Sequence, residues 1–488
     1  MTEVPEEGSL EQLLGRRGRR LRILVLATTS GCVLGLAVFA LLREFPARPF
    51  GVADDFRVFF AAAELVGRGI NPYHLGALQA AEQAAHHYPA SNPTLDTFAD
   101  PPVVARLLLP FSYLPFWISY ALFSAIGAGL LLLTLTLLAR DLGWRHIATL
   151  SAGVILSWIG LLGFLDGQFD ALLFAAVVGS MLLAWHERSL AAGAVLALIL
   201  LKPTLLWPAP IFLFLALWPD RGRALRFAAG FVAMSAIAAL ACWPWLGAWT
   251  HQLGAFASGV GSRQPDLAGL PGLLRAAPAS WHLGTGVTAP LTLLLIGLAL
   301  VAMAVFGAWM MLSPDWRRVS PVGRIAWAVA LSVGIWLLVT PYAHPNDDLL
   351  LLPLFMLTVG RDSRRLHGLG LALAAGTMAL LLLTWPGGVV PWPLALVVFG
   401  VLALVLWVRR TDIRLTGFGA GMCLMSVALL PPVWDFHLLS VGLAPVAVGI
   451  LVVEGARTCW MEVGGAGTGP AYFADPTALG ITPKPAGA

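Results

Sequence analysis

The sequence predicts an all-α polytopic membrane protein, a bundle of about 11–14 transmembrane helices whose outer loops carry interfacial helices. Composition is the first reason: 58% of the 488 residues are hydrophobic, 11% are charged, and the mean hydropathy is +0.82. The second reason is length, because apolar runs recur from Leu21 to Val453 and the longer ones reach the roughly 17–25 residues that cross ~30 Å of hydrocarbon. The third is charge, because arginine-rich segments follow alternate runs, as short cytoplasmic loops do.

We expect one transmembrane domain with two polar tails. Residues 1–20 carry several glutamates and no apolar core, so they are predicted to be a cytoplasmic tail and not a cleavable signal peptide. The transmembrane domain is assigned to residues 21–456. Residues 457–488 are predicted to form a second cytoplasmic tail that is disordered, because from Gly464 onward the chain is rich in Gly, Pro and Ala.

The alternation of basic segments sets the direction of each crossing. Ile23–Leu42 is the first, outward crossing; residues 43–101 then form a first outer loop, and Phe116–Ala139 returns inward. A second outer loop, residues 246–286, follows the outward crossing Phe227–Trp245. The other predicted crossings are residues 147–165, 171–185, 191–201, 205–218, 291–312, 325–340, 349–359, 369–384, 394–408, 418–430 and 438–453.

Several function classes are disfavoured by composition and motifs. The four cysteines lack metal-type spacing, so neither a disulfide nor a zinc site is expected, and no cofactor or metal is predicted. The pI of 9.1 reflects arginines gathered in loops on one side of the membrane, so no nucleic-acid partner is expected. The P-loop, GxGxxG, HExxH and GxSxG patterns of soluble enzymes are missing from the sequence.

Two carboxylates lie directly after the first crossing. Asp54 and Asp55 precede Phe56–Val66, a segment with the pattern of an amphipathic interfacial helix. One interpretation is structural, since Asp is a favoured helix N-cap. The other is catalytic, since a carboxylate at a membrane surface can act as a general base. The two interpretations are compatible, because one acid suffices for a cap.

Two further outer segments carry polar side chains. Tyr73, in the turn sequence that ends the predicted interfacial helix, is either an aromatic anchor at the membrane interface or a contact for sugar or acceptor. Gln168 lies in L-D-G-Q-F-D, residues 165–170, which is either a plain helix connector or a binding turn whose amide hydrogen-bonds hydroxyls.

The candidate phosphate ligands are cationic or imidazole side chains. Lys202 stands between apolar runs at a predicted outer helix end, where it can snorkel to the interface or neutralise a phosphate. His344 and Asp347 lie in T-P-Y-A-H-P-N-D-D. Asn346 or Asp347 can cap a helix there, His344 can hydrogen-bond a phosphate or a sugar, and Asp347 can contact sugar. Arg263 in the second outer loop is a free surface residue or a bidentate phosphate ligand.

A series of short motifs in a fixed order resembles a known family. D-F-x-V-F, A-A-A-E-L-V-G-R-G and N-P-Y occupy residues 55–59, 61–69 and 71–73. P-P-V-V-A-R-L-L-L-P-F-S-Y-L-P, G-Q-F-D, K-P and H-P-N-D-D-L-L-L-L-P follow at residues 101–115, 167–170, 202–203 and 344–353. Together they resemble glycosyltransferase family 87, enzymes of the GT-C superfamily that use polyprenyl-phosphate sugars, and imply a GT-C-like helical bundle.

The resemblance implies a function for these residues. An inverting single displacement on the outer face of the plasma membrane would move a sugar, mannose in most of the family, from polyprenyl phosphate to a cell-envelope glycolipid or glycan. Asp55 would be the general base, with Asp54 the second choice. Lys202, His344 and Arg263 would meet the departing phosphate. The family usually has Tyr-Pro-Pro where this chain has Asp100-Pro101-Pro102 after an insertion, residues 84–97, which leaves the acceptor open.

Three alternatives remain at the level of sequence. An arabinofuranosyltransferase of the same family differs only in the sugar. A transporter or flippase of lipid-linked sugars should show internal repeats and polar groups near mid-membrane, whereas the polar residues here gather at one face. A catalytically inactive assembly protein would keep the fold without the chemistry.

Overall fold

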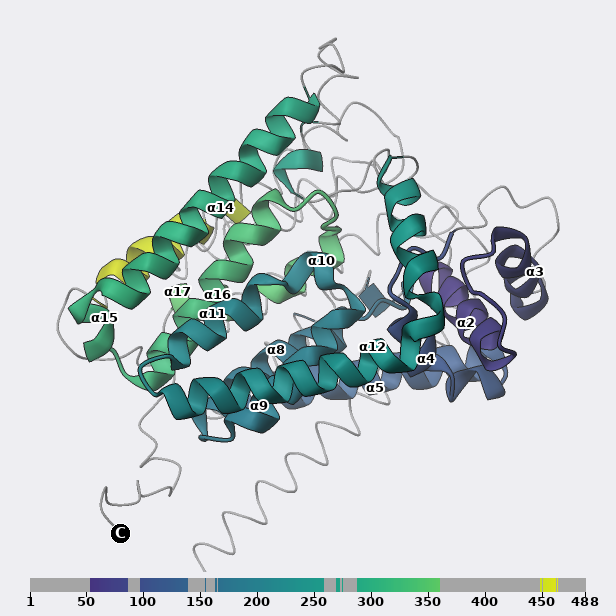
Figure 1. Cartoon of the computed structure of the whole chain (residues 1–488), viewed down its shortest axis with the longest axis horizontal. Helices are drawn as coiled ribbons and strands as arrows, with labels where there is room; N and C mark the ends of the chain where they lie inside the picture. Colours follow the sequence, from purple (N-terminus) through teal and green to yellow (C-terminus); the bar gives the residue numbers. More distant parts are fainter. Residues whose placement is uncertain are drawn as a thin grey trace, which may run out of the picture.

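The computed structural model describes residues 53–86, 97–138, 154, 163–164, 166–258, 269–272, 274, 288–359, 448–449, 451–461 and 463. Within these ranges the regular structure is entirely helical, with no strand. Figure 1 shows the helices running along one another, with α2 and α3 at the end of the molecule opposite α14 and α15.

Four helices are long and apolar enough to cross a membrane: α5 (Phe116–Leu138), α12 (Arg221–Ser258), α14 (Thr288–Leu312) and α16 (Pro321–Val339). The prediction of an all-α polytopic membrane protein is therefore confirmed. The number of crossings stays a prediction. The crossings at residues 23–42, 369–384, 394–408 and 418–430, most of 147–165 and the start of 438–453 lie outside the described residues, as do the tail 1–20 and residues 464–488.

The helix after the first acids is longer and more deeply placed than predicted. The segment expected at the interface is α2 (Asp54–Gly67), and nearly all of its side chains from Phe56 onward are buried. Arg57, which suggested a polar face, is 1% exposed and donates from Nε to Glu82 of α3 (Leu75–His86) at 3.3 Å. The exposed polar face expected of an amphipathic helix is therefore wrong, because α3 supplies the carboxylate that lets the arginine be buried. The position of α2 relative to the membrane interface stays a prediction.

The N-cap interpretation of the first acids is also wrong. The residue before α2 is Ala53, with φ 63°, and it makes no side-chain cap hydrogen bond. Asp54 and Asp55 are the first two residues of the helix itself. Carboxylates in a first turn are still favoured there by the positive end of the helix dipole.

The helix of the crossing expected to end at Trp245 continues beyond that residue, and the bounds of the second outer loop stay a prediction. The crossing expected to end at Trp245 continues as α12 to Ser258, so the helix has 38 residues and contains Pro244. Proline in a helix interior removes one hydrogen bond and bends the axis, and Figure 1 shows α12 turning towards α4 (Pro102–Leu108). Arg106 of α4 stacks over the Trp245 ring at 4.6 Å.

Short helices fill the centre of the molecule. Their bounds are α8 (Asp170–Trp185), α9 (Ser189–Leu196), η2 (Ala197–Leu201), α10 (Pro203–Leu206) and α11 (Pro208–Leu217). The proline that follows Lys202 has no N–H to donate, which explains the break between η2 and α10. Helices α9 and α12 approach closely at Gly193, where a Cβ would lie 2.0 Å from the Phe227 carbonyl oxygen.

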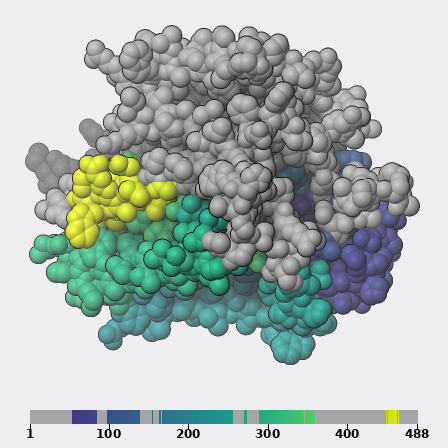
Figure 2. Space-filling view, turned by 90° about the horizontal axis from the view of Figure 1, so that it is seen from above, coloured from purple at the N-terminus to yellow at the C-terminus, as the bar shows by residue number. Residues whose placement is uncertain are grey.

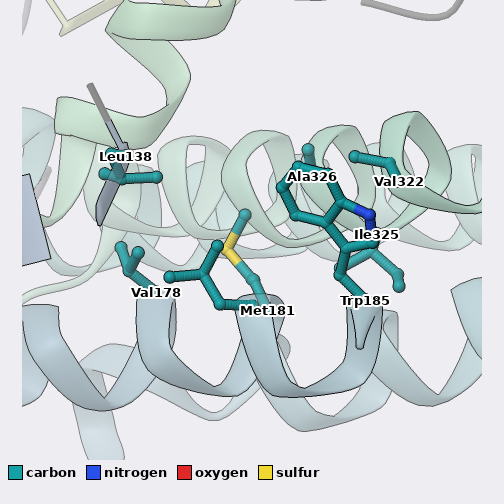
Figure 3. Close-up of a pocket in the computed structure, with 8 residues that line it drawn as sticks. Leu138, Val178, Met181, Trp185, Val322, Ile325 and Ala326 are labelled. Atoms are coloured by element: carbon teal, nitrogen blue, oxygen red, sulfur yellow. The ribbon is translucent and has the colours of Figure 1, made fainter. Parts of the chain in front are cut away.

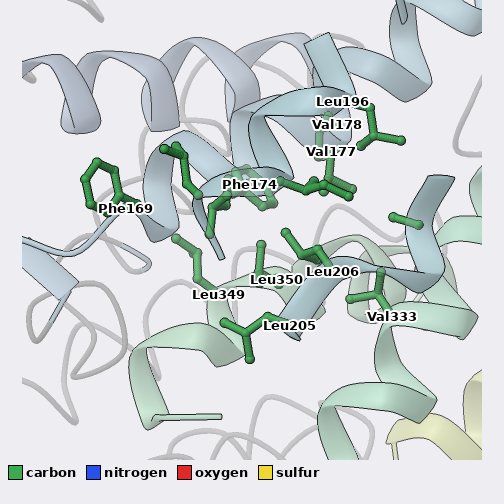
Figure 4. Close-up of a cluster of buried hydrophobic side chains, with 14 of the residues drawn as sticks. Phe169, Phe174, Val177, Val178, Leu196, Leu205, Leu206, Val333, Leu349 and Leu350 are labelled. Atoms are coloured by element: carbon green, nitrogen blue, oxygen red, sulfur yellow. The ribbon is translucent and has the colours of Figure 1, made fainter. Parts of the chain in front are cut away.

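A buried apolar layer supports the ends of these short helices. Figure 4 shows Phe169 and Phe174 of the α8 region facing Leu349 and Leu350 of η4 (Pro345–Leu351), with Leu206 of α10 between the elements. All five side chains are buried. The apolar layer therefore fixes three helix ends relative to one another, and α17 (Leu352–Val359) continues from η4.

The last described helical residues, 451–461, pack on α14. Trp460 stacks on Trp309 with ring centroids 5.4 Å apart, and Figure 2 shows these C-terminal residues in yellow lying against the green helices. The helix extends past residue 456, so the start of the predicted disordered tail is helical. Cys242 and Cys459 are buried and form no disulfide within the described part of the chain, whereas Cys32 and Cys423 lie outside it.

Candidate functional site

Three helix ends meet at one buried lysine. Lys202, between η2 and α10, donates from Nζ to Asp170 Oδ1 at 3.2 Å and to Asp347 Oδ1 at 3.1 Å. The side chain of Lys202 is 11% exposed, and the two carboxylates are 3% and 0% exposed. Such a burial is tolerated only because each charge is paired and hydrogen-bonded. We refer to Lys202, Asp170 and Asp347 as the lysine cluster.

Local structure explains why both carboxylates lie here. Asp170 is the first residue of α8 and Asp347 lies in the first turn of η4, positions where the helix dipole favours an acid. Asp347 Oδ2 accepts from the His344 backbone N–H at 2.8 Å, which caps η4. Asn346 Nδ2 donates to Asp170 Oδ2 at 2.6 Å and so joins the two helix ends.

The predicted general base lies beside a turn that only glycine permits. Gln168 donates from Nε2 to Asp55 Oδ2. The preceding Gly167 has φ +75°, and a Cβ there would lie 2.4 Å from Phe56 Cβ. Because the glycine lets this turn approach α2 so closely, Gln168 reaches the half-buried Asp55.

A third segment, residues 98–100, is held from two sides. Tyr73 donates from its hydroxyl to the Asp100 carbonyl oxygen at 2.8 Å, and Trp249 of α12 donates from Nε1 to the Ala99 carbonyl oxygen at 3.1 Å. The Tyr73 ring also lies 5.2 Å from the Phe98 ring. The backbone is therefore fixed, whereas the Asp100 carboxylate makes no hydrogen bond within the described part of the chain.

Charges from all three elements act on Asp100. Burial raises the pKa of Asp100 to about 7; the positive charges of Lys202 and His344 oppose this rise, and the negative charges of Asp55 and Asp347 add to it. These four side chains are therefore the charged neighbours of Asp100. The arrangement joins the Asp55 turn and the lysine cluster into one site.

Lys202 and Asp347 are held in their ionised forms, whereas burial raises the pKa of Asp170 to about 6. Burial would lower the pKa of Lys202, but Asp170, Asp347 and Asp100 together raise it above its ordinary value. Burial opposes ionisation of Asp347, and the charge of Lys202 nevertheless keeps the pKa of that carboxyl below its usual range. Burial and the adjacent Asp347 hold the pKa of Asp348 well above its usual range. Asp348 Oδ2 is buried and has no hydrogen-bond partner among the described residues.

The structure brings together most of the residues named from the sequence. Asp55, Gln168, Lys202, His344 and Asp347 all belong to this site. Whether any of them binds sugar or phosphate stays a prediction. Two others cannot be placed in the site: Arg263 lies outside the described residues, and of Asp54 only the backbone, at the start of α2, is described.

Tyr73 has a structural contact that the sequence did not reveal. The Tyr73 hydroxyl donates to the Asp100 carbonyl oxygen. The backbone N–H of Tyr73 donates to Asn71 Oδ1 at 3.1 Å, which closes the turn before it. Next to it, His74 Nδ1 accepts from the Ala77 N–H at 3.2 Å and so caps α3. The side chain of Tyr73 thus positions residue 100, and its contact with a sugar stays a prediction.

Four polar residues of the site were not among the sequence candidates: Asp100, Asp170, Asn346 and Asp348. Their signal was present, since acids next to long apolar runs are costly unless they are paired. Asp170 begins an apolar helix, and Asp348 precedes four leucines. What the sequence did not show was which cation, if any, each acid meets.

The described residues offer no metal-binding group, and the small cavity between two helices lies away from the site. No group of three or more His, Cys, Asp or Glu side chains in the described residues is arranged to hold a metal ion. A small apolar pocket lies between α8 and α16, where Figure 3 shows Met181, Trp185, Val322 and Ile325. This pocket is at the Trp185 end of α8, whereas the site is at the Asp170 end, so it does not belong to the chemistry.

The comparisons with known proteins give one match. The model of Glycosyltransferase family 87 matches residues 98–341, which is half of the 488-residue chain. No curated protein and no solved structure matches. The matched residues include Asp100, Gln168, Asp170 and Lys202, and they exclude Asp55 and the turn of residues 344–348.

Proposed function

The chain belongs to glycosyltransferase family 87 and is a membrane glycosyltransferase, and we propose that it transfers mannose from a polyprenyl-phosphate donor to a glycolipid or glycan acceptor of the cell envelope. The observation that carries the proposal is the carboxylate of Asp55. It is half-buried, bound by Gln168 on Oδ2, and lies beside a polar site within an otherwise apolar bundle. Mannose is proposed because it is the usual sugar of the family that the motifs resemble.

Asp55 is the general base in this proposal. The acceptor hydroxyl gives its proton to Asp55 while its oxygen attacks the anomeric carbon of the donor. The bond between that carbon and the phosphate oxygen breaks, so the sugar is inverted and polyprenyl phosphate departs. The hydrogen bond from Gln168 stabilises the ionised carboxylate and fixes its direction, as a base within reach of the reacting proton requires.

The departing phosphate needs positive charge or hydrogen-bond donors. Lys202 has three N–H groups, and its two carboxylate partners use two of them. The third N–H and the half-buried imidazole of His344 are the proposed phosphate donors in the described part of the site. Arg263 is a further proposed donor from the second outer loop. Sugar contacts are proposed for Gln168, Asp347 and Tyr73.

The orientation follows from the charge pattern of the sequence. We place the protein in the plasma membrane with its N-terminus in the cytoplasm and the site on the outer face, because the basic clusters then fall inside. The proposal requires no metal or organic cofactor. The donor's prenyl chain would lie among lipid-exposed helices such as α12 and α14, which carry many exposed apolar side chains.

The test is transfer by the purified full chain. Polyprenyl-phosphate-mannose and an alkyl mannoside would be supplied, and labelled disaccharide would be measured. Loss of the base typically costs roughly 10²–10⁴-fold in rate, and we expect this loss from Asp55→Asn. The isosteric control is Asp315→Asn, which changes a solvent-exposed acid of α15 (Pro314–Arg318).

Three outcomes would count against the proposal in different ways. Equal rates for the wild type and Asp55→Asn would remove the base assignment and leave the transferase. Transfer of arabinofuranose in place of mannose would correct the sugar. Translocation of the intact headgroup across liposomes, without transfer, would favour a flippase.

A further inference from the structure

Asp100 is an acid of the site whose backbone is held by two other segments, while its carboxylate forms no hydrogen bond with the described residues. Its carbonyl oxygen accepts from Tyr73 at 2.8 Å, and the carbonyl of Ala99 accepts from Trp249 at 3.1 Å. These bonds come from the segment before α3 and from α12, which are far apart in the sequence. They use the backbone alone, so the fold does not need a carboxyl group at this position.

The Asp100 carboxylate is open to a ligand. The side chain is half-buried and forms no hydrogen bond with the described residues. The nearby positive charge of Lys202 is already bound by Asp170 and Asp347. A donor that reaches this partly buried carboxylate would form a charge-assisted hydrogen bond, which is stronger than a neutral one.

The chemistry of the neighbours indicates the kind of partner. Asp100 is itself an acid, and Asp55 and Asp347 add negative charge around it, so a phosphate would bind at Lys202 and His344 and not at Asp100. A hydroxyl group is neutral and can donate a hydrogen bond to a carboxylate. A sugar acceptor offers hydroxyls on neighbouring carbons, and Asp55 is the proposed base for one of them.

We propose that Asp100 accepts a hydrogen bond from a second hydroxyl of the acceptor, so that the site selects a sugar with two neighbouring hydroxyls and presents one of them to Asp55. This inference rests on the proposed function. The hydroxyl at Asp100 keeps its proton throughout. The hydroxyl at Asp55 loses its proton to that carboxylate, forms the new bond to the anomeric carbon and displaces the phosphate.

The experiment separates acceptor binding from donor activation. The full chain would receive polyprenyl-phosphate-mannose with octyl α-mannoside or its singly deoxygenated analogues, and both transfer and donor hydrolysis by water would be measured. Because a hydrogen bond to a charged group is involved, we expect Asp100→Ala to raise the KM of octyl α-mannoside about 10–100-fold. The ratio of transfer to hydrolysis should fall accordingly, since water needs no second hydroxyl contact.

Two further readouts distinguish binding from a structural effect. In the wild type, one deoxygenated analogue should have the highest KM. In Asp100→Ala the KM of that analogue should come close to the KM of octyl α-mannoside, because the hydroxyl that it lacks no longer has a partner.

Asp100→Asn keeps the shape of the side chain but cannot ionise. The wild-type KM for the acceptor should rise as pH falls below about 7, because Asp100 then takes up a proton. The charged groups that face Asp100 are Lys202, Asp55, His344 and Asp347. The Asp100→Asn variant should lack this pH dependence of KM.

Each result has a defined meaning. Asp315→Asn should match the wild type in every assay. An unchanged acceptor KM in Asp100→Ala, with the wild type active, would overturn the role of Asp100 and leave the proposed function standing. Hydrolysis without transfer to any mannoside would overturn the assignment of a sugar diol. A wild type that neither transfers nor hydrolyses would overturn the proposed function itself.

Discussion

Two buried ion-pair groups of this protein differ in how their charges balance. Arg57 and Glu82 join α2 to α3 at 3.3 Å and are 1% and 0% exposed. The lysine cluster sets one cation, Lys202, against two carboxylates, Asp170 and Asp347. The first group pairs one positive with one negative charge, whereas the second carries an excess of acid.

The difference indicates which group the fold needs and which group the chemistry needs. A contact of one cation with one carboxylate between two helices is neutral, and such a buried pair can often be exchanged for apolar side chains without loss of fold. An excess of acid is harder to explain by packing, and two further acids, Asp100 and Asp348, lie nearby with raised pKa values. We therefore assign Arg57 and Glu82 to the support of α2, and the lysine cluster to the working site.

The largest effect is expected from removing one partner of a buried group. Lys202→Met removes the cation that both Asp170 and Asp347 contact, and Arg57→Met removes the guanidinium that Glu82 contacts at 3.3 Å. Removing one partner of a buried pair costs about 3–5 kcal/mol, so both variants should lower the midpoint of thermal unfolding in detergent. A midpoint within error of the wild type for either variant would contradict the pairing seen here. Asp315→Asn, in an exposed i,i+3 pair, is the control, since such pairs contribute about 0–1 kcal/mol.

A smaller effect should separate the two groups more sharply. Arg57→Met combined with Glu82→Leu removes both charges of the first pair, and we expect most of the lost stability and the transfer activity to return. Lys202→Met combined with Asp170→Leu still leaves Asp347 buried, so neither should return. Unfolding midpoints and transfer rates of the four single and two double variants would measure this. Recovery of activity in the Lys202 double variant would show that the lysine cluster is only structural.

The hydropathy of the sequence predicts the long helices well. The crossing expected at Phe116–Ala139 is α5, Phe116–Leu138, because length and apolar composition define such a helix locally. The end of α12 was not predicted, because it depends on a tertiary contact. The polar residues after Trp245 suggested a loop, but the helix continues to Ser258, where Trp249 finds a partner in the Ala99 carbonyl.

Several residues of the candidate site were predicted from the sequence, but their contacts with one another were not. Lys202 and Asp347 were recognised because charged residues beside apolar runs require a reason. Their ion pair joins residues 145 positions apart, and only tertiary packing brings them together. The burial of α2 was missed for the same reason, since Glu82 comes from a helix that was not predicted. The excess of acid around Asp100 likewise appears only in three dimensions.

The smallest of these effects concerns Asp348, whose Oδ2 atom is buried and has no hydrogen-bond partner among the described residues. Burial and the adjacent Asp347 raise its pKa well above the ordinary value. The folded protein therefore holds a proton that the unfolded chain releases above about pH 4, and stability from this group is lost as pH rises towards the folded pKa. Asp348→Asn cannot ionise, so its unfolding midpoint should fall less than that of the wild type between pH 5 and 8. At pH 8 we expect the free energy of unfolding of Asp348→Asn to exceed that of the wild type by about 1 kcal/mol, the cost of one unsatisfied buried group. Identical pH profiles would mean that Asp348 meets a cation or donor, and the excess of acid that distinguishes the lysine cluster from the Arg57 pair would then be smaller.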